Sequence, residues 1–447
     1  MHTFQNLWQS ILNFIFYYPL FMSYLWMIGA LIFCVKERRE PPVQQPPALP
    51  HYPLVAVLVP CFNEGDNAEE TLAQALKLNY PHFEVIAIND GSSDNTAAVL
   101  DRLALQYSQL RVVHLAENQG KAMALQAGSL VTEAEYLLGI DGDALLDPDA
   151  AQWMIRHFLT HRNVAAVTGN PRIRNRSTLL GRVQVGEFSS IIGMIKRAQR
   201  TFGRLFTVSG AVTAFRKSAV HAVGYWSPNM LTEDIDISWK LQRSGWDIEF
   251  EPNAMVWVLM PETYSGLWKQ RLRWAMGGAQ VLLKNIDVLF KPKLNFLWPL
   301  ILELSLTLVW SYLMLFIVIL WVLHLILPSA GFPAMSSPFL PYGTGIFIGA
   351  TCLLQFALSM WMDSRYEKSL AKNYFWMIWY PFVFWIITVT ATIVAMPKVL
   401  ARKDEKRARW VSPDRGVRTE RDDNNLEQQV DDAHSIHSQH VVERKVP

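Results

Sequence analysis

The stretch Tyr136-Leu137-Leu138-Gly139-Ile140-Asp141-Gly142-Asp143-Ala144 is the most informative part of this sequence. An apolar run typical of a buried strand ends directly in two carboxylates, which a single glycine separates. An Asp-Gly-Asp at the carboxyl end of a strand can bind a hard divalent cation through oxygen and leave room for a nucleotide diphosphate. Asp-rich turns are also common in loops, so the stretch by itself leaves an ordinary turn open.

The residues before this stretch alternate between strand and helix patterns. Strands are predicted at 54–59, 83–88, 111–115 and 136–140, and helices at 68–78, from about 94 to 107, and at 120–131. This alternation predicts an α/β fold with a parallel sheet and crossover helices. Ligands of such sheets bind outside the carboxyl ends of the strands, where this chain has Asn63-Glu64, Asn89-Asp90-Gly91 and Asp141-Gly142-Asp143.

The sequence excludes two common nucleotide-binding classes. No Gly-x-Gly-x-x-Gly follows the first predicted strand, and Gly120-Lys121 lacks the upstream glycine of a P-loop, so dehydrogenases and P-loop ATPases are ruled out. Lys121 at the start of a helix nevertheless suits an anion such as phosphate, because free backbone N–H groups and the helix dipole favour negative charge there. A solvated surface lysine is the alternative.

Two later segments carry further candidate side chains. Thr232 fits a helix N-cap, and Glu233 or Asp234 fits a first-turn acid. A carboxylate here is also a candidate general base if it lies beside a cavity. Helical spacing puts Gln270, Arg273 and Trp274 on one face, where the arginine can face a leaving diphosphate and the tryptophan a sugar ring. Helix capping and a basic, aromatic helix at a membrane surface are the respective alternatives.

The composition indicates a membrane protein. Hydrophobic residues make up 51% of the chain and charged residues only 18%. Residues 11–35 are uncharged and long enough to cross a bilayer, and the basic stretch that follows predicts that the chain continues in the cytoplasm. Further uncharged segments at 304–327, 342–362 and 373–397 are candidate spans.

The sequence leaves the side of the C-terminus ambiguous. Three spans after a cytoplasmic domain would put the C-terminus outside, whereas the basic residues between 398 and 409 favour the inside. One segment is therefore expected not to cross fully, either 373–397, which Pro381 interrupts, or the region 297–327, which contains Glu303. We favour a cytoplasmic tail.

The order of these segments predicts five regions. They are a transmembrane segment (1–35), a proline-rich linker (36–53), a cytoplasmic domain (54–296), a membrane region of about three segments (297–397) and a basic, then disordered tail (398–447). The three cysteines form no CxxC pair, so the sequence supports neither a zinc site nor a disulfide framework.

Four motifs, in this order and between membrane segments, resemble the processive family 2 glycosyltransferases. These motifs are Asn89-Asp90-Gly91, Asp141-Gly142-Asp143, Thr232-Glu233-Asp234 and Gln270-x-x-Arg273-Trp274. Longer stretches resemble the poly-β-1,6-N-acetyl-D-glucosamine synthases of bacteria. Examples are Val59-Pro60-Cys61-Phe62-Asn63-Glu64, Asn118-Gln119-Gly120-Lys121-Ala122 and the segment from Arg407 to Gly416.

The resemblance implies a GT-A fold, a UDP-N-acetylglucosamine donor and Mg²⁺ or Mn²⁺ as cofactor. On the donor side, Asp90 would contact uridine, with Asn63 and Glu64 near the base. Lys121 and Arg273 would face the diphosphate. Asp141 would touch the nucleotide and the metal, and Asp143 would bind the metal directly. On the acceptor side, Asp234 would be the base, Gln270 a positioning residue and Trp274 the platform for the acceptor sugar.

The resemblance also implies a function and its setting. The chain would be a processive, inverting enzyme of the bacterial inner membrane that polymerises N-acetylglucosamine for an exported biofilm polysaccharide; no nucleic-acid partner is expected. It has one leading span and lacks the cyclic-dinucleotide domain of cellulose synthases, so a small membrane subunit is expected to complete the polymer channel. The segment from Trp410 to Gly416 would be a cytoplasmic gating segment over the nucleotide.

Three alternatives remain open from the sequence. The chain could make another β-linked polymer of the cellulose, chitin or hyaluronan type, or it could transfer a single sugar to a lipid, although the Gln-x-x-Arg-Trp motif argues against single transfer. A non-catalytic membrane scaffold or channel subunit is the alternative from another class, and the presence of Asp143, Asp234 and Arg273 argues against it.

Overall fold

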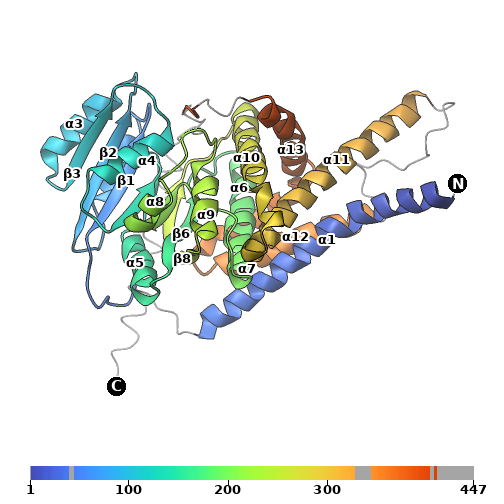
Figure 1. Cartoon of the computed structure of the whole chain (residues 1–447), viewed down its shortest axis with the longest axis horizontal. Coiled ribbons are helices and arrows are strands. Elements are labelled where there is room, and N and C mark those ends of the chain that lie inside the picture. The colour runs from blue at the N-terminus through green and yellow to red at the C-terminus, as the bar shows by residue number, and fades with distance from the viewer. Residues whose placement is uncertain (1, 40–44, 328–343, 403–406, 410–447) are drawn as a thin grey trace.

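The computed structural model describes residues 2–39, 45–327, 344–402 and 407–409 of the 447. A mixed sheet with its helices occupies one side of the molecule, and long apolar helices extend from the other side (Figure 1). The predicted disordered tail, and the proposed gating segment from Trp410 onward, lie outside the described residues.

The described residues form one eight-stranded sheet with the strand order β3-β2-β1-β4-β7-β6-β8-β5. Four strands pair in parallel, as predicted: β1 (Val55–Cys61), β2 (Phe83–Asp90), β3 (Leu110–Leu115) and β4 (Tyr136–Ile140). The sheet continues with β7 (Val212–Arg216), antiparallel to β4, then β6 (Val164–Ile173), β8 (Asp247–Val258) and the short β5 (Leu145–Leu146).

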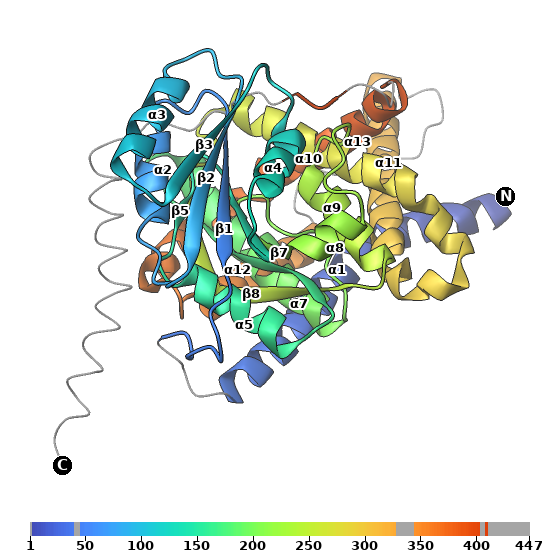
Figure 2. The ribbon, with the colours of Figure 1, turned by 60° about the vertical axis from the view of Figure 1, so that its left-hand side comes forward.

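Alternate residues of β1 enter two separate cores. Val55, Val57 and Val59 pack in the cluster that includes α2 (Ala68–Ala75), α3 (Thr96–Gln106) and α5 (Ala150–Thr160). Ala56 and Leu58 pack in the other cluster, with α4 (Lys121–Leu130), α8 (Lys217–Ala222) and α9 (Glu233–Arg243). Helices therefore cover both faces of the sheet (Figure 2), which explains why the parallel strands are continuous apolar runs.

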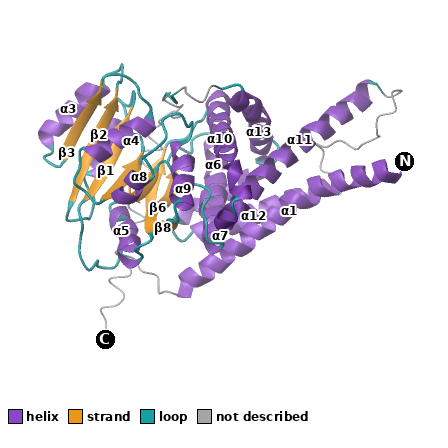
Figure 3. Cartoon of the chain, viewed as in Figure 1, coloured by secondary structure: helices purple, strands orange, loops and turns teal. Residues whose placement is uncertain are grey.

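A bent helical segment connects the sheet to the apolar helices. It comprises α6 (Leu179–Phe188), the π-helix η1 (Ser189–Ile195) and α7 (Lys196–Thr201). After β8, α10 (Tyr264–Asn285) leads through the short 3₁₀ helices η2 (Ile286–Phe290) and η3 (Pro292–Leu297) into the next apolar helix. Both connections end beside long helices, as the view coloured by secondary structure shows (Figure 3).

Three helices of the described chain are long and apolar enough to cross a membrane. They are α1 (His2–Arg39), α11 (Trp298–Ile326) and α12 (Thr344–Asp363). The fourth candidate segment is divided into the 3₁₀ helix η5 (Lys368–Trp379) and α13 (Phe384–Leu400), which meet at an angle of 66°. Pro381 lies in this break, and a proline removes a backbone hydrogen bond and interrupts a helix.

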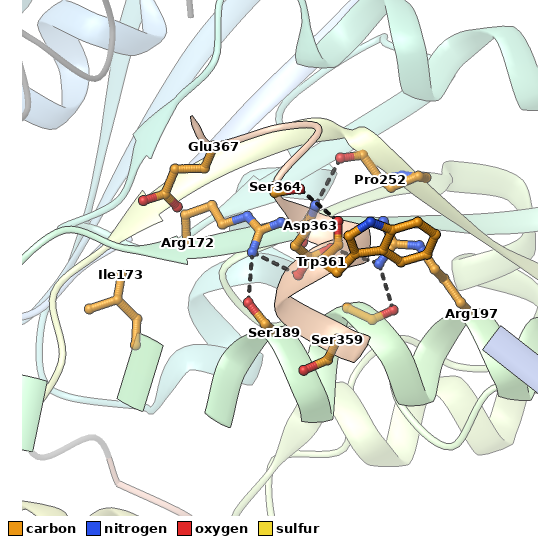
Figure 4. Close-up of polar contacts among 12 residues, drawn as sticks. Arg172, Ile173, Ser189, Arg197, Pro252, Ser359, Trp361, Asp363, Ser364 and Glu367 are labelled. Carbon is orange, nitrogen blue, oxygen red and sulfur yellow. Dashed lines mark hydrogen bonds and ion pairs between the residues drawn. The ribbon is translucent and has the colours of Figure 1, made fainter. Parts of the chain in front are cut away.

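A buried ion cluster attaches α12 to the sheet (Figure 4). Asp363, at the end of α12, accepts hydrogen bonds from Arg172 of β6 and Arg197 of α7, each at 2.8 Å. The side chains are 0%, 3% and 0% exposed, respectively. The turn of η1 approaches so closely that a Cβ on Gly193 would lie 2.4 Å from an Asp363 carboxylate oxygen. The cluster therefore fixes the position of an apolar helix relative to the sheet.

Candidate active site

The predicted strand-end residues meet at one edge of the sheet. Cys61 of β1 is in register with Asn89 of β2, and Leu58 of β1 with Gly139 of β4, so these strands end side by side. The turns that follow carry Asn63-Glu64 and Asp141-Gly142-Asp143, and Asp90 is the last residue of β2. The shared location follows from the parallel pairing, as predicted.

Close packing explains the glycine between the two acids. A Cβ on Gly142 would lie 2.9 Å from the Pro60 carbonyl oxygen and 3.2 Å from Cγ of Glu64. Asp143 is only 4% exposed, and its burial, together with the charge of Asp141, raises the pKa of Asp143 to about 8. Two carboxylates in such a position repel each other, and a nearby positive charge relieves the repulsion.

Lys121 links three of the segments around the site. Its ammonium group forms an ion pair with Asp141, lies 3.3 Å from Oε1 of Glu233, and donates a hydrogen bond of 3.0 Å to the Gly210 carbonyl. Burial lowers the pKa of Lys121, but the surrounding carboxylates outweigh burial and raise it overall. Lys121 therefore stays protonated, and its side chain is only 15% exposed, so the alternative of a solvated surface lysine does not describe its surroundings.

Asp234 lies in the first turn of α9, close enough to Lys121 for their charges to interact. Burial and the charge of Glu233 raise the pKa of Asp234 to about 6, although Lys121 and Arg273 oppose them. Thr232 is the N-cap of α9 as predicted, but its hydroxyl makes no capping hydrogen bond. The Thr232 Oγ1 is buried and has no hydrogen-bond partner in the described chain, and a Cβ on Gly277 of α10 would lie only 1.9 Å from it.

The residues predicted to bind the nucleoside support neighbouring loops. Asp90 accepts hydrogen bonds from the backbone N–H groups of Gln119 at 2.7 Å and Gly120 at 2.8 Å. Asn63 has a positive φ of 54°, and its side-chain oxygen accepts a hydrogen bond from the Ser93 N–H at 2.9 Å. These contacts hold the turns after β1 and β2 against the loop that begins α4.

The three α10 residues lie in different environments. Arg273 is exposed and contributes positive charge near Asp234. Trp274 is partly buried against the core that includes β1. The Gln270 amide nitrogen lies 3.8 Å from the sulfur of Met260, while its buried oxygen has no hydrogen-bond partner in the described part of the chain. The Gln270 oxygen and the Thr232 hydroxyl can each accept a hydrogen bond from a bound molecule or from water.

Two residues of the site were not identified from the sequence. Gly210 leaves space for its neighbours, because a Cβ there would lie 3.1 Å from the Lys121 nitrogen and 3.3 Å from a carboxylate oxygen of Asp234. Lys196 is buried at the start of α7, where it donates a hydrogen bond of 3.2 Å to Thr168. Burial lowers the pKa of Lys196 to about 7, and Asp234 opposes this shift. No sequence pattern distinguishes either residue from ordinary helix or loop positions.

The last described residues, 407–409, lie against the loop that begins α4. Arg407 donates a hydrogen bond to the Gln119 side chain, and the Ala408 N–H donates one of 2.8 Å to the Pro228 carbonyl. A Cβ on Gly120, whose φ is 90°, would lie 2.2 Å from the Ala408 carbonyl oxygen. The start of the tail therefore lies on the same side of the molecule as the strand ends.

The carboxylate oxygens of Asp141 and Asp143 suit a divalent cation that is also bound by a second molecule. Asp141 and Asp143 present oxygen ligands in a region rich in carboxylates, which is the chemistry that Mg²⁺ and Mn²⁺ prefer. Within the described ranges, no group of three His, Cys, Asp or Glu side chains is arranged to hold a metal by itself. A metal bound here would therefore need further oxygen ligands, such as those of a diphosphate.

The chain is similar to known proteins over most of its length. Residues 51–277 match the family model described as glycosyltransferase like family 2. A poly-β-1,6-N-acetyl-D-glucosamine synthase of Staphylococcus epidermidis is 40% identical over 422 residues, which cover 91% of this chain and 99% of the relative. A synthase of the same name from Staphylococcus aureus (strain MSSA476) is 41% identical over 416 residues, with the same coverage.

A solved structure supports the fold. A mannosyltransferase from Pyrobaculum calidifontis, in complex with GDP-Man and Mn²⁺, matches with a TM-score of 0.52 and 20% sequence identity, covering 86% of this chain and 99% of that chain. The GT-A fold implied by the sequence resemblance is confirmed by this match together with the family model.

Proposed function

Because this chain belongs to the family 2 glycosyltransferases, with poly-β-1,6-N-acetyl-D-glucosamine synthases as full-length relatives, we propose that it polymerises N-acetylglucosamine from UDP-N-acetylglucosamine. The product is the β-1,6-linked polymer named in those relatives, exported for a biofilm matrix. The observation that carries the proposal is the convergence of Asp141, Lys121 and Asp234, from three separate segments, at the carboxyl ends of parallel strands.

Asp234 acts as the general base in this proposal. Its carboxylate takes the proton from the acceptor hydroxyl while that oxygen attacks the anomeric carbon of the donor sugar. The bond between this carbon and the UDP oxygen breaks, and its electron pair leaves with UDP, so that the configuration inverts in a single displacement. A base with a pKa of about 6 is largely ionised at neutral pH and still accepts a proton readily.

Lys121 and Arg273 stabilise the leaving diphosphate. Both bear positive charge beside the carboxylates of the site, and Lys121 lies where α4 begins, so that free backbone N–H groups also face an anion there. Asp143, with Asp141, would hold Mg²⁺ or Mn²⁺. A divalent cation at that position neutralises negative charge on the leaving group. Asp90, Asn63 and Glu64 hold the uridine end of the donor.

Trp274 offers its ring to the acceptor sugar and Gln270 positions the acceptor end. The aromatic ring binds a sugar mainly through its flat face, which tolerates successive identical units and so suits a processive enzyme. We propose residues 54–296 as the catalytic domain, with 1–35 and 297–397 as membrane regions joined to it through a linker at 36–53, and 398–447 as the tail.

The enzyme is proposed to lie in the inner membrane with its catalytic domain in the cytoplasm. If α1, α11 and α12 cross and the bent pair η5–α13 does not, the chain returns to the cytoplasm before the basic residues that follow Pro397. The contact of Arg407 with Gln119 supports this arrangement. With this number of crossings, the basic residues after Pro397 lie in the cytoplasm, so the span count and the basic tail no longer conflict.

Asp143→Ala is expected to lower polymer synthesis from labelled UDP-N-acetylglucosamine by at least about 10²-fold, because the variant loses an oxygen ligand for the cation. Calorimetry should show that Mn²⁺ no longer strengthens UDP binding, which is a readout independent of turnover. Asp101→Ala, at an exposed position of α3, serves as the matched control. Full activity of Asp143→Ala in membranes would contradict the proposed site, and a wild-type enzyme that makes no polymer from this donor would contradict the proposed substrate.

A small membrane subunit is proposed to complete the polymer channel. By length and composition, the described residues contain three helices that can span a membrane, or four if the bent pair η5–α13 also crosses. We expect the purified chain to form UDP and short products but to secrete little polymer into sealed vesicles. Addition of membrane extract from a producing cell should restore secretion. Full-rate translocation by the purified chain alone would refute the need for a partner.

A further inference from the structure

Arg271 occupies an unassigned position of the Gln270-x-x-Arg273-Trp274 motif and forms a buried ion pair. Its guanidinium lies 2.5 Å from a carboxylate oxygen of Glu187, the penultimate residue of α6. The two side chains are 4% and 1% exposed. Burial raises the pKa of Glu187, whereas Arg271 opposes this. The pair therefore joins the interior of α10 to α6 rather than forming part of the solvent-exposed surface.

The same guanidinium lies over the ring of Trp274. Its central carbon is 4.4 Å from the ring centroid, and the two residues are three positions apart on α10, where side chains on one helix face meet. A cation above an indole is attracted by the negative face of the ring. Arg271 therefore covers one face of Trp274 and restrains the plane of the ring, so that a sugar can stack only on the opposite face.

Glu187 in turn contacts the break in the last apolar segment. The hydroxyl of Tyr380 lies 3.4 Å from the second oxygen of Glu187, and Tyr380 follows directly after η5. Its ring stacks on Phe384 of α13, with centroids 5.9 Å apart, and meets Phe356 of α12 edge to face at 4.8 Å. The neighbouring Gly186 is also tightly packed, because a Cβ there would lie 2.0 Å from the sulfur of Met377.

We propose that Arg271 and Glu187 are positioning residues that fix the orientation of Trp274 and tie it to the membrane-side break at Tyr380. This inference rests on the proposed role of Trp274 as the acceptor platform. A growing polymer must stay bound between successive transfers and must then move toward the membrane. A ring held in one plane retains the polymer end in register, so the pair controls product length more than the rate of each transfer.

The decisive comparison is between a single and a double variant. In Arg271→Met, the ring loses its cation and Glu187 loses its partner, so both stability and product length are expected to fall. In Arg271→Met with Glu187→Gln, no charged group is left unpaired, and replacing a buried ion pair by neutral groups of similar size is often tolerated. The double variant should therefore recover thermal stability, but its polymer should stay about tenfold shorter than that of the wild type.

A matched control is an arginine outside the site that also lies over an aromatic ring and pairs with a carboxylate. Arg204 lies 4.6 Å above the ring of Phe296 and pairs with Asp247 at 2.6 Å. Arg204→Met should leave product length unchanged. The measurements are the size distribution of labelled polymer, the rate of UDP release per enzyme and thermal unfolding, all on the full chain in lipid nanodiscs. UDP release should fall less than about threefold in the double variant, which would show that the pair affects polymer length more than the rate of transfer.

Tyr380→Phe tests the connection to the break, since it keeps the ring and removes only the hydroxyl. Shorter polymer with an unchanged rate of UDP release would support the connection, and wild-type length would remove Tyr380 from the proposal. Recovery of full product length in the double variant, or equal shortening in Arg204→Met, would overturn the proposal as a whole. If the proposed function itself is wrong, the results will differ from these. The wild type would then make no polymer, or Trp274→Ala would keep its full product length.

Discussion

Asp234→Asn is expected to lower the rate of polymer formation by about 10²–10⁴-fold, the usual contribution of a general base. The amide keeps the shape of the side chain but cannot take a proton from the acceptor hydroxyl. Because burial and Glu233 disfavour the ionised carboxylate in the folded protein, removing its charge should not destabilise the fold. The measurement is initial polymer synthesis together with thermal unfolding, and Asp101→Asn on exposed α3 is the matched control.

The pH dependence gives a second readout of the same residue. Asp234 must be ionised to act as a base, and its pKa is raised to about 6, so kcat/KM is expected to decline as the pH falls through about 6. The charged or titratable groups that face Asp234 are Glu233, Lys121, Arg273 and Lys196. A wild-type profile that stays flat from about pH 7 to about pH 5 would contradict the assignment, as would substantial activity of Asp234→Asn.

Asp363→Ala is expected to destabilise the protein by about 3–5 kcal/mol, the range for removing one partner of a buried ion pair. The variant leaves Arg172 and Arg197 at 3% and 0% exposure without the carboxylate that neutralises them. Water cannot reach these guanidinium groups to compensate, so their charges are costly in the folded state. The expected observations are a large fall in the thermal unfolding temperature in detergent and a low yield of monodisperse protein.

A surface pair supplies the control for this prediction. Glu69 pairs with Arg102 at 2.7 Å, but both side chains are about half exposed, and such pairs contribute little because water and salt screen them. Glu69→Ala should therefore leave the unfolding temperature nearly unchanged. If Asp363→Ala unfolds at the wild-type temperature, the buried cluster does not hold α12 against the sheet.

The placement of the strand-end residues of the candidate site could be predicted from the sequence. Continuous apolar runs between helical patterns predict buried parallel strands, and parallel pairing requires that their carboxyl ends meet at one edge. This pairing predicts that Asn63, Asp90 and Asp141 lie at one edge, and the registers of β1, β2 and β4 agree with it. The other half of the sheet was not predicted. It combines antiparallel pairs of β7 and β5 with the parallel pair β6–β8, and this pairing joins segments that are far apart in the sequence.

The sequence by itself therefore determined that Asp141-Gly142-Asp143 ends a buried strand, since local periodicity and the geometry of parallel sheets are sufficient for that conclusion. Only the tertiary structure decided which distant side chains meet there. Lys121 pairs with Asp141, Arg271 with Glu187, and Asp363 with two arginines, all through contacts between residues far apart in the chain. Such pairings depend on how helices pack on the sheet, and no local pattern of residues encodes that packing.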